Sequence, residues 1–451
     1  MPENRPAARR RRPPRRAELV PDLRRRAVAA RAKVSTAVAK GSAGAERATQ
    51  DIGRRFSSPL HDEWVASVLG VCLGVAFGVC FLTGLVDYLA QHPPHWFHLP
   101  TRPINFFRVT QGVHVITGIA AIPLLLAKLW TVWPKLFSWP PVHNVAHALE
   151  RLSLVALVGG SLFQLLTGVA NIAYWYSPMP FFFPTAHFWT AWIVIGALVI
   201  HVGTKGVIAR HALGRGAYGD EGDAAPEAIT DVAAITDVTT RAGPAPASSG
   251  RGGLSRRGFV ATVLGSAAVL VVTVAGETVT PFRRLALLAP RNPVVGPQHL
   301  PVNQSAIEAG VTSSAIDPAY RLEVTGNCRT PRTFTVAELR ALPQRAAGLP
   351  ITCVEGWSAA ASWRGISLPY LLSLVGARPR ARIRVESLEA SDRLYSSSII
   401  DPQHAADPDT LLALELNGAP LDLDHGYPVR LIAPDRPGVL QTKWITKVVV
   451  L

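Results

Sequence analysis

Residues 352–365 read TCVEGWSAAASWRG, and this segment carries the most specific information in the chain. Cys353 follows a short run with the alternation of a β-strand, Gly356 comes three residues later, and a helix-like run follows at Leu368–Val375. A thiolate at a strand end, close to a glycine that lets backbone approach, suits a nucleophile or a ligand for a soft metal. Spacing alone favours a disulfide with Cys328 instead, 25 residues earlier, if the compartment is oxidising.

The region around this segment is predicted to be a separate domain. After about Arg283 the sequence is no longer membrane-like; it is rich in proline up to Pro301, and then polar and apolar residues alternate. Such alternation over Tyr320–Val324 and Ile383–Ser387 is typical of β-strands. Residues 285–451 are therefore expected to form a mixed α/β domain of the α+β type, outside any membrane.

Three segments of this region resemble the molybdopterin-binding domain of the sulfite oxidase superfamily. They are TCVEGWSAAASWRG at 352–365, LALELNGAPLDLDHGYPVRLIAP at 412–434 and GVLQTKWITKV at 438–448. They occur in the order found in that family and cover most of residues 300–451. The Cys-Val-Glu-Gly-Trp form is closer to exported bacterial members similar to the methionine-sulfoxide reductase catalytic subunit than to sulfite oxidases proper.

The resemblance implies a molybdenum cofactor and a set of residues that bind it. Cys353 would supply a thiolate to molybdenum beside the two dithiolene sulfurs of a pyranopterin, a soft-donor set suited to two-electron oxo transfer. The cofactor's phosphate would require fixed cationic donors. The candidate cofactor contacts are Asn303, His404, His425, Gly426, Arg430, Arg436, Gly438 and Lys443. Without the order of the motifs, each of these cations is more simply a surface charge.

The first part of the chain has the composition of a membrane protein. Hydrophobic residues make up 48% of the 451 residues and charged residues 17%, a balance too apolar for a purely soluble protein. Five segments are long enough for the roughly 20 helical residues that a hydrocarbon core requires. They are Trp64–Ala90, Arg108–Trp130, Ala146–Trp175, His187–Ile208 and Phe259–Thr280. The sequence thus predicts an all-α bundle of five transmembrane helices, and its four cysteines exclude a disulfide-built scaffold.

Charge predicts how the chain is oriented in the membrane. Residues 1–60 are expected to be a disordered, arginine-rich cytoplasmic tail, which holds most of the formal net charge of +15. A nucleic-acid arm is the alternative; the membrane segments that follow favour the orientation signal, so no nucleic-acid partner is expected. A four-helix domain at 61–211 would return the chain to the cytoplasm, followed by a flexible linker at 212–254.

The fifth helix, at 255–282, is preceded by Ser255-Arg256-Arg257-Gly258-Phe259-Val260, which resembles a twin-arginine export signal. That export route carries domains that fold before they cross the membrane, which suits a domain that receives a cofactor in the cytoplasm. The simpler alternative is that the two arginines only flank the helix on its cytoplasmic side. We expect the twin-arginine translocation machinery as a partner, and a catalytic domain outside the cytoplasm.

Four histidines lie in the predicted helices, where an ionisable side chain is a functional candidate because burying it is costly unless it has a partner. His187 and His201 face the same side of one helix, near opposite membrane faces. By depth, His114 matches His187 and His147 matches His201. Two such pairs would allow a bundle to bind two b-type haems, each iron taking two imidazoles. Histidines at the interface of a simple anchor are the alternative.

The bundle is similar to bacterial cytochrome b561-type membrane domains. Together the two resemblances predict a membrane-bound molybdopterin-dependent oxidoreductase that exchanges electrons with the quinone pool through haem b. Reduction of a small sulfoxide or N-oxide is the first expectation, and oxidation of sulfite or a related compound is the second. The alternative from another class is an exported domain without haem that acts as a binding or structural module. Retention of Cys353 among so many cations argues against it, because a pure binding domain has no use for a thiolate there.

Overall fold

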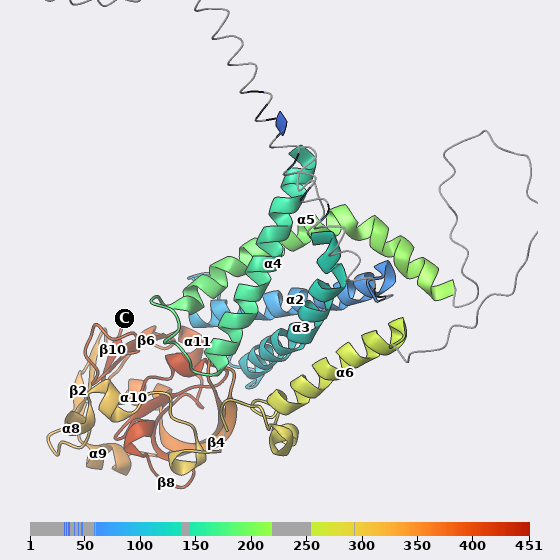
Figure 1. Ribbon diagram of the computed structural model, residues 1–451. Helices are drawn as coiled ribbons and strands as arrows, with labels where there is room; N and C mark the ends of the chain where they lie inside the picture. The colour runs from blue at the N-terminus through green and yellow to red at the C-terminus, as the bar shows by residue number, and fades with distance from the viewer. Residues whose placement is uncertain are drawn as a thin grey trace, which may run out of the picture.

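The computed structural model describes residues 60–136, 145–218, 254–292 and 294–451, together with single positions between 31 and 58. Within these ranges the side chains of 134–136, 146, 147, 215–218 and 280 are not described. Figure 1 shows two parts, a set of long helices and a mixed α/β domain at one end of them. The predictions for the arginine-rich tail and for most of the linker lie outside the described residues.

Five long helices form the first part within the described ranges, and each contains a segment long and apolar enough to cross a membrane. They are α2 (Glu63–Gln91), α3 (Phe106–Leu136), α4 (Val145–Ile172), α5 (Phe183–Tyr218) and α6 (Arg256–Ala275). Each predicted segment therefore corresponds to a helix, although the ends differ. The fifth helix ends at Ala275, five residues earlier than expected, and a turn leads into the short helix η1 (Thr280–Leu285).

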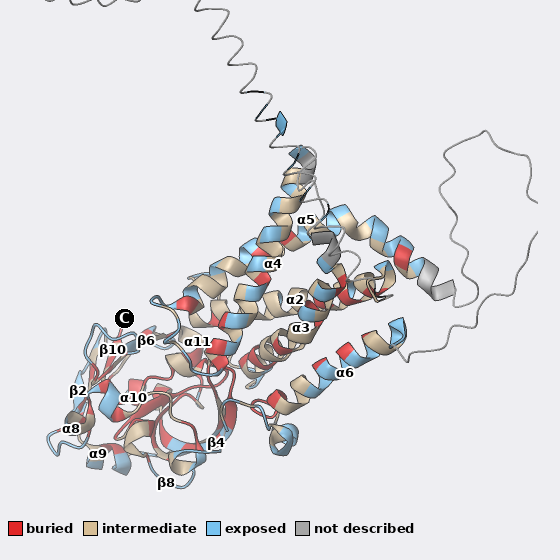
Figure 2. Cartoon of the chain, viewed as in Figure 1, coloured by how far each residue is buried: buried red, intermediate tan, exposed pale blue. Residues whose placement is uncertain are grey.

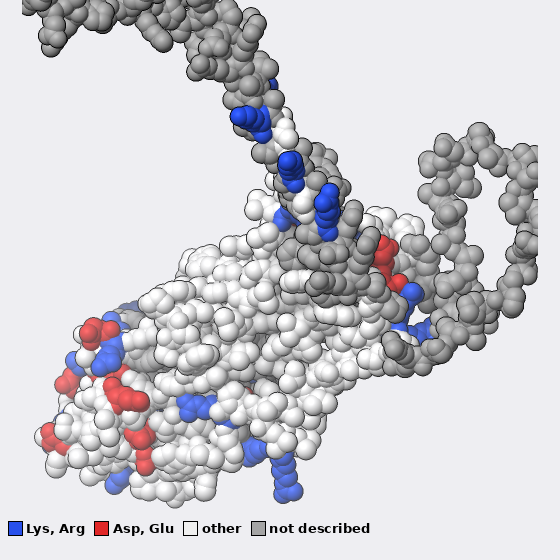
Figure 3. Space-filling model, viewed as in Figure 1, with Lys and Arg blue, Asp and Glu red and all other residues white. Residues whose placement is uncertain are grey.

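The helices pack as a bundle. Helix α2 packs on α3 and α5, α4 packs on α5 and α3, and α6 lies against α3 and α2. Asp62 begins α2 by accepting hydrogen bonds from the backbone N–H groups of Trp64 and Val65, and Ser255 begins α6 in the same way through Gly258. Figure 2 shows that the outward faces of the helices are only partly buried, and Figure 3 shows few charges between the two ends of the bundle. An uncharged, apolar outer surface of this kind is what a lipid environment requires.

Two five-stranded sheets build the C-terminal domain. The first has the order β2 (Arg332–Phe334), β1 (Leu322–Gly326), β10 (Ile445–Val450), β5 (Ile383–Ser387) and β6 (Ser397–Ile400). The second has the order β3 (Arg345–Thr352), β4 (Ser358–Ser367), β7 (Leu411–Leu416) and β8 (Ala419–Pro420), with β9 (Arg430–Ile432) also on β7. Only the β1–β10 pair is parallel among these strand pairs. The mixed α/β prediction is confirmed, and β5 has the predicted bounds.

Short helices connect the strands. They are η2 (Pro297–His299), α7 (Ala306–Ala309), α8 (Thr312–Ala315), α9 (Val336–Ala341), α10 (Leu368–Leu374), α11 (Pro402–Ala406), η3 (Leu423–His425) and η4 (Gly438–Leu440). Helices α7 and α9 each begin with a capping box, formed by Ser305 with Glu308 and by Thr335 with Glu338. The helix expected after the cysteine segment is α10, which ends one residue before the predicted boundary.

The domain is joined to one end of the bundle by polar contacts. Asp435 accepts a hydrogen bond from the backbone N–H of Phe107 at 2.6 Å, at the first turn of α3. Arg102, in the α2–α3 connection, forms ion pairs with Asp407 at 3.3 Å and Asp409 at 2.7 Å. The start of α6 lies at the opposite end of the bundle, where Arg256 pairs with Asp62 at 3.4 Å. The chain therefore enters α2 and α6 from the same end, away from the domain.

Candidate functional site

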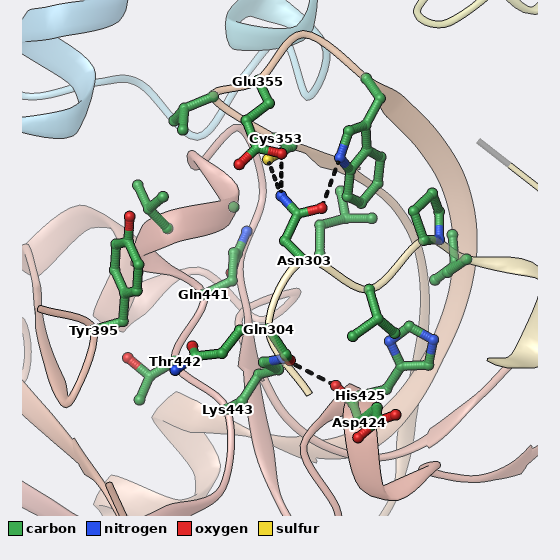
Figure 4. Close-up of a pocket in the computed structure, with 18 of the residues that line it drawn as sticks. Asn303, Gln304, Cys353, Glu355, Tyr395, Asp424, His425, Gln441, Thr442 and Lys443 are labelled. Atoms are coloured by element: carbon green, nitrogen blue, oxygen red, sulfur yellow. Dashed lines mark hydrogen bonds between the residues drawn. The ribbon is translucent and has the colours of Figure 1, made fainter. Parts of the chain in front are cut away.

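A cavity of about 330 Å³ lies where the domain meets the helices (Figure 4). One group of lining residues surrounds Cys353 at the end of β3, and another comes from the chain between η3 and β10. A third group comes from the connection between α4 and α5. The lining includes Tyr174, Tyr176, Phe182, Asn303, Gln304, Cys353, Val354, Glu355, Trp357, Glu389, Leu394, Tyr395, Asp424, His425, Arg430, Gly438, Gln441, Thr442 and Lys443.

Cys353 is the first residue of a hairpin loop between β3 and β4. Thr352 pairs with Ser358 across the hairpin, so residues 353–357 form the loop, and the backbone N–H of Cys353 donates to the carbonyl of Trp357 at 2.9 Å. Gly356 has φ +100°, a conformation that favours glycine, so the sequence Cys-Val-Glu-Gly-Trp suits the turn. The structure leaves Cys353 and Cys328 as free cysteines, so the disulfide alternative is wrong.

Asn303 holds the sulfur of Cys353 in place. Its Nδ2 donates to Cys353 Sγ at 2.9 Å and to Glu355 Oε2 at 2.6 Å, while its Oδ1 accepts from Trp357 Nε1 at 3.2 Å. The asparagine therefore has partners on both sides of its amide, which fixes the orientation of the amide. Asn303, one of the predicted cofactor contacts, thus lies beside the thiol.

The thiol is in surroundings that oppose its ionisation. Cys353 is 7% exposed, and burial, together with the nearby Glu355 carboxylate, raises the pKa of its thiol above the ordinary value. Burial also raises the pKa of Glu355, to about 7. Coordination to a metal ion would offset this effect, because metal binding deprotonates a thiol.

The opposite end of the cavity holds buried cations. Arg430 is 3% exposed; its Nη1 donates to the carbonyl of His425 at 3.0 Å, and its guanidinium lies over the ring of Trp363. Its Nε is buried without a hydrogen-bond partner among the described residues. Lys443 Nζ donates to the carbonyls of Gln304 at 2.5 Å and Asp424 at 2.9 Å. Figure 4 shows Lys443 and His425 away from Cys353.

These cations are poorly compensated within the chain. Burial lowers the pKa of Lys443 to about 7, with a further contribution from Arg430, and burial lowers the pKa of Arg430 to about 9. Burial and the adjacent Arg430 also lower the pKa of His425 to about 4. An anion bound at this end would reverse these shifts, because it would stabilise the charged forms. The arrangement therefore suits an anionic group.

Gly426 and Gly438 contribute through close packing. A Cβ on Gly426, which has φ +102°, would lie 3.0 Å from the Cβ atoms of both Arg430 and Lys443. The glycine thus lets the two cations approach each other, although it does not itself line the cavity. Gly438 does line the cavity, and its Cβ would lie 2.9 Å from the carbonyl oxygen of Thr352.

Two predicted cofactor contacts, His404 and Arg436, are not among the lining residues. Arg436 donates instead to the carbonyls of Ile399 at 2.6 Å and Leu440 at 3.1 Å, which connects two loops of the domain. His404 is buried in α11. Burial lowers the pKa of His404 to about 3, so its ring is neutral at neutral pH. The local sequence carries no signal that separates these two residues from the basic residues that line the cavity.

Comparisons with known proteins identify the family of the C-terminal region. Residues 309–451 match the family described as oxidoreductase molybdopterin binding domain. The C-terminal region is a molybdopterin-binding oxidoreductase domain. We refer to residues 285–451 below as the molybdopterin domain.

Curated relatives match only parts of the chain. The chain is 36% identical over 127 residues to the putative protein-methionine-sulfoxide reductase subunit YedZ1 of Azospira oryzae, covering 28% of this chain and 47% of that protein. It is 32% identical over 156 residues to the mitochondrial sulfite oxidase of Drosophila melanogaster, covering 29% of this chain and 27% of that protein. It thus spans less than half of either relative. Among solved structures, the sulfane dehydrogenase SoxCD of Paracoccus pantotrophus shares 25% identity over 30% of this chain and 40% of that chain, with a TM-score of 0.28.

The residues of the cavity fit a molybdenum cofactor. A soft sulfur donor at one end suits molybdenum, and the buried cations and the unpartnered Arg430 Nε at the other end suit a terminal phosphate. Cys353 would ligate the metal with its Sγ oriented by Asn303, while Arg430, Lys443 and His425 would hold the phosphate end. The molybdopterin domain therefore has candidates for the metal ligand and for the phosphate contacts within one cavity.

A second candidate site lies between the helices. The rings of His114 on α3 and His187 on α5 have centroids 6.3 Å apart. His114 Nδ1 lies 2.8 Å from the carbonyl oxygen of Cys80, and His187 Nδ1 lies 2.7 Å from Thr167 Oγ1. Both Nδ1 atoms thus have partners, which leaves the Nε2 atoms as potential metal ligands.

The second predicted pair, His147 with His201, is only partly described. His201 is half-buried on α5, and its Nδ1 has no partner among the described residues. His147 belongs to α4, but its side chain lies outside the described residues. Its pairing with His201 therefore stays a prediction.

Proposed function

We propose that the protein is a membrane-bound molybdenum oxidoreductase that reduces a small sulfoxide or N-oxide with electrons from quinol. One oxo substrate and one quinol would give the deoxygenated product, quinone and water. Two electrons and two protons are transferred, so atoms and charge balance. The cofactor, when bound, would supply the two-electron oxo-transfer chemistry. The chain's own residues would anchor it, orient its sulfur ligand and connect it to the membrane helices.

The observation that carries the proposal is the contact between the Cys353 loop and the helices. The carbonyl oxygen of Val354 accepts hydrogen bonds from Gln111 Nε2 on α3 and Asn171 Nδ2 on α4, both at 3.1 Å. A Cβ on Gly356 would lie 3.0 Å from Val115 Cγ2, so the loop rests directly on α3. The residue beside the sulfur ligand is therefore bonded to two membrane helices.

The same stretch of α3 carries His114, three residues after Gln111 and so about one helical turn away. Two opposed imidazoles bound to one metal through Nε2, with metal–nitrogen bonds of about 2.0 Å, have ring centroids roughly 6 Å apart. The observed His114–His187 separation of 6.3 Å supports a haem b at this level. Gly84 supports it further, because a Cβ there would lie 2.7 Å from the His114 ring and exclude its present position. The predicted His147–His201 pair would bind the second haem.

The orientation of the chain completes the proposal. Because α2 and α6 both begin at the end opposite the molybdopterin domain, a cytoplasmic arginine-rich tail places that domain outside the cytoplasm. Arg256 and Arg257 then lie at the cytoplasmic start of α6, as a twin-arginine signal requires. Replacing both with lysine should keep the domain inside the cell, which protease protection of spheroplasts would show.

Two measurements on the purified full-length chain test the function. Quinol should be oxidised when a sulfoxide or N-oxide is added, and dithionite-reduced spectra should show b-type haem bands that diminish in His114→Ala. His92→Ala is the matched control, because His92 is exposed at the end of α2. A colourless protein, or one in which sulfite reduces the haem while sulfoxides leave it reduced, would overturn the proposal.

A further inference from the structure

One wall of the cavity belongs to the membrane part of the chain. Tyr174, Tyr176 and Phe182 line the cavity together with Cys353 and Glu355, yet they lie in the connection between α4 and α5. We call residues 173–182 the α4–α5 connection. The cavity that would bind substrate is therefore built by both parts of the chain, and the molybdopterin domain alone leaves it open on this side.

Hydrogen bonds hold the α4–α5 connection against the Cys353 end of the cavity. Tyr176 OH donates to Asn171 Oδ1 at 2.9 Å or to Glu355 Oε1 at 3.3 Å. Tyr174 OH donates to the carbonyl of Asn303 at 2.8 Å. The connection thus bonds to both residues that contact the sulfur ligand, and its position is fixed relative to the reacting end.

The wall is aromatic and partly exposed. The ring of Tyr176 stacks on Phe183 with centroids 5.3 Å apart and lies nearly parallel to Phe182 at 6.2 Å. Phe182 is 56% exposed, and Leu394, which also lines the cavity and is next to Tyr395 in sequence, is 70% exposed. Exposed apolar side chains in the lining of a cavity mark a place where an apolar ligand gains by burying them.

Charge in the cavity is distributed unevenly. Among the described lining residues the basic side chains are His425, Arg430 and Lys443, which gather at the phosphate end, where Asp424 and Glu389 also line the cavity. The charged lining residue beside Cys353 is Glu355 (Figure 4). The nearby cation, Arg291, lies outside the lining with its guanidinium over the ring of Tyr174 at 4.9 Å, where its charge acts on Glu355. An oxyanion approaching Cys353 would therefore meet the Glu355 carboxyl group within the cavity and no cation among the described lining residues there, which is less favourable than binding a neutral ligand.

We propose that Tyr176 and Phe182 of the membrane part determine the substrate specificity of the cavity. Together with Leu394 and Tyr395 they select a neutral sulfoxide or N-oxide that carries an apolar substituent, and they disfavour oxyanions such as sulfite and nitrate. The inference rests on the proposed oxo-reductase function and adds to it the part of the chain that reads the substrate. Phe182 packs against the apolar substituent, and Tyr176 supports Phe182 while holding the connection to Glu355.

Steady-state kinetics of the full-length holoenzyme test this inference. Reduced benzyl viologen serves as electron donor, so that the route through the helices is not required. In Phe182→Ala the kcat/KM for methyl phenyl sulfoxide relative to dimethyl sulfoxide should fall about fivefold, the typical value of one aromatic contact. Phe181→Ala is the matched control: Phe181 is an exposed neighbour outside the lining, and its variant should keep the wild-type ratio.

Binding provides a second measurement that is independent of turnover. Methyl phenyl sulfone, which resembles the substrate, should quench tryptophan fluorescence of the wild type and bind about fivefold more weakly to Phe182→Ala. Leu394→Ala, at another exposed apolar residue of the lining, should weaken binding in the same direction if Phe182→Ala does not fold.

The outcomes separate the inference from the proposed function. A wild type that reduces sulfoxides, with unchanged substrate ratio and sulfone affinity in Phe182→Ala and Leu394→Ala, would overturn the inference alone. Tighter binding of sulfite than of the sulfone would also overturn it. A wild type that reduces neither sulfoxides nor N-oxides would overturn the proposed function, while the sulfone titration would still decide whether Phe182 contacts an apolar ligand.

Discussion

The two ends of the cavity are built in different ways. The phosphate end takes Asp424, His425, Arg430 and Lys443 from one stretch of the molybdopterin domain. The Cys353 end combines a hairpin loop, Asn303 from an earlier segment and the α4–α5 connection of the membrane part. Anchoring of a cofactor is thus local to the domain, whereas the reacting end depends on how the domain sits on the helices. Substitutions at the two ends should therefore have separable effects.

The largest effect is expected at the metal. Cys353→Ser replaces a soft sulfur donor by a hydroxyl, so molybdenum content should fall from about one atom per chain by at least about tenfold. Metal analysis by mass spectrometry measures it. Cys328→Ser is the control, because Cys328 packs against the core of the first sheet, and that variant should retain the metal. Equal molybdenum in both variants would contradict the assignment of Cys353.

The phosphate end should respond to pH in the cofactor-free protein. The folded pKa of Lys443 is about 7, below the ordinary value of 10.5, so between these values the unfolded chain binds more protons. Stability of the apoprotein should therefore rise as pH increases from 7 to 10, at up to about 1.4 kcal/mol per pH unit.

Lys443→Met should flatten that dependence and also weaken cofactor retention, because the cation that would face the phosphate is removed. Thermal unfolding at several pH values measures the first effect, and released pterin measures the second. Lys447→Met is the control, because Lys447 pairs with Glu323 on the surface. A wild-type slope that survives in Lys443→Met would show that another group is responsible.

A smaller effect is expected where the loop contacts the helices. Gln111→Leu removes one of the two donors to the Val354 carbonyl, while Asn171 keeps the other. Molybdenum should stay bound, but oxidation of the proposed haem by substrate should slow, because the loop is held less firmly on α3. Stopped-flow spectroscopy follows the haem, and dye-driven turnover serves as the internal reference. Equal slowing of both rates would place the defect in the cavity instead.

The smallest effect concerns the junction itself. Burial raises the pKa of Asp435 to about 7, so its folded pKa exceeds the unfolded value of 3.8. Its contribution to stability is then fully present below pH 3.8 and is lost as pH rises through 7. Asp435→Asn keeps an oxygen acceptor for the Phe107 N–H and should remove this pH dependence. Asp435→Ala, which also removes the acceptor, should cost about 1 kcal/mol. Urea unfolding at pH 5 and 8 distinguishes them, with Asp392→Asn, an exposed site, as control.

The sequence predicted those features of the fold that a local pattern of residues determines. Apolar length located all five helices, and alternation located β5, because burial of one face leaves a periodic trace. Cys353, Arg430 and Lys443 lie within continuous motifs and were found. Tyr176 was missed because its partner, Glu355, is 179 residues away, and no local signal marks a contact that only the packing of two parts creates.

For basic residues the sequence predicted too many cofactor contacts, because some of them do not line the cavity. Arg436 and Arg430 occur in the same motif and look alike in sequence. Each donates to two backbone carbonyls, but Arg430 lines the cavity and has a buried Nε without a partner among the described residues, whereas Arg436 does not line the cavity. Only the folded position of each side chain separates them. The proximity of His114 to His187, by contrast, was predicted from their depths along two helices, measured against the lysines near one end of each helix.

The hydrogen bond from the first turn of α3 to Asp435 also bears on the order of assembly. Helix α3 is made and inserted long before residue 435 exists, so its first turn must wait for the C-terminal domain to arrive before it gains this acceptor. The bundle therefore completes the hydrogen bonds of this helix end only once the C-terminal domain has folded against it.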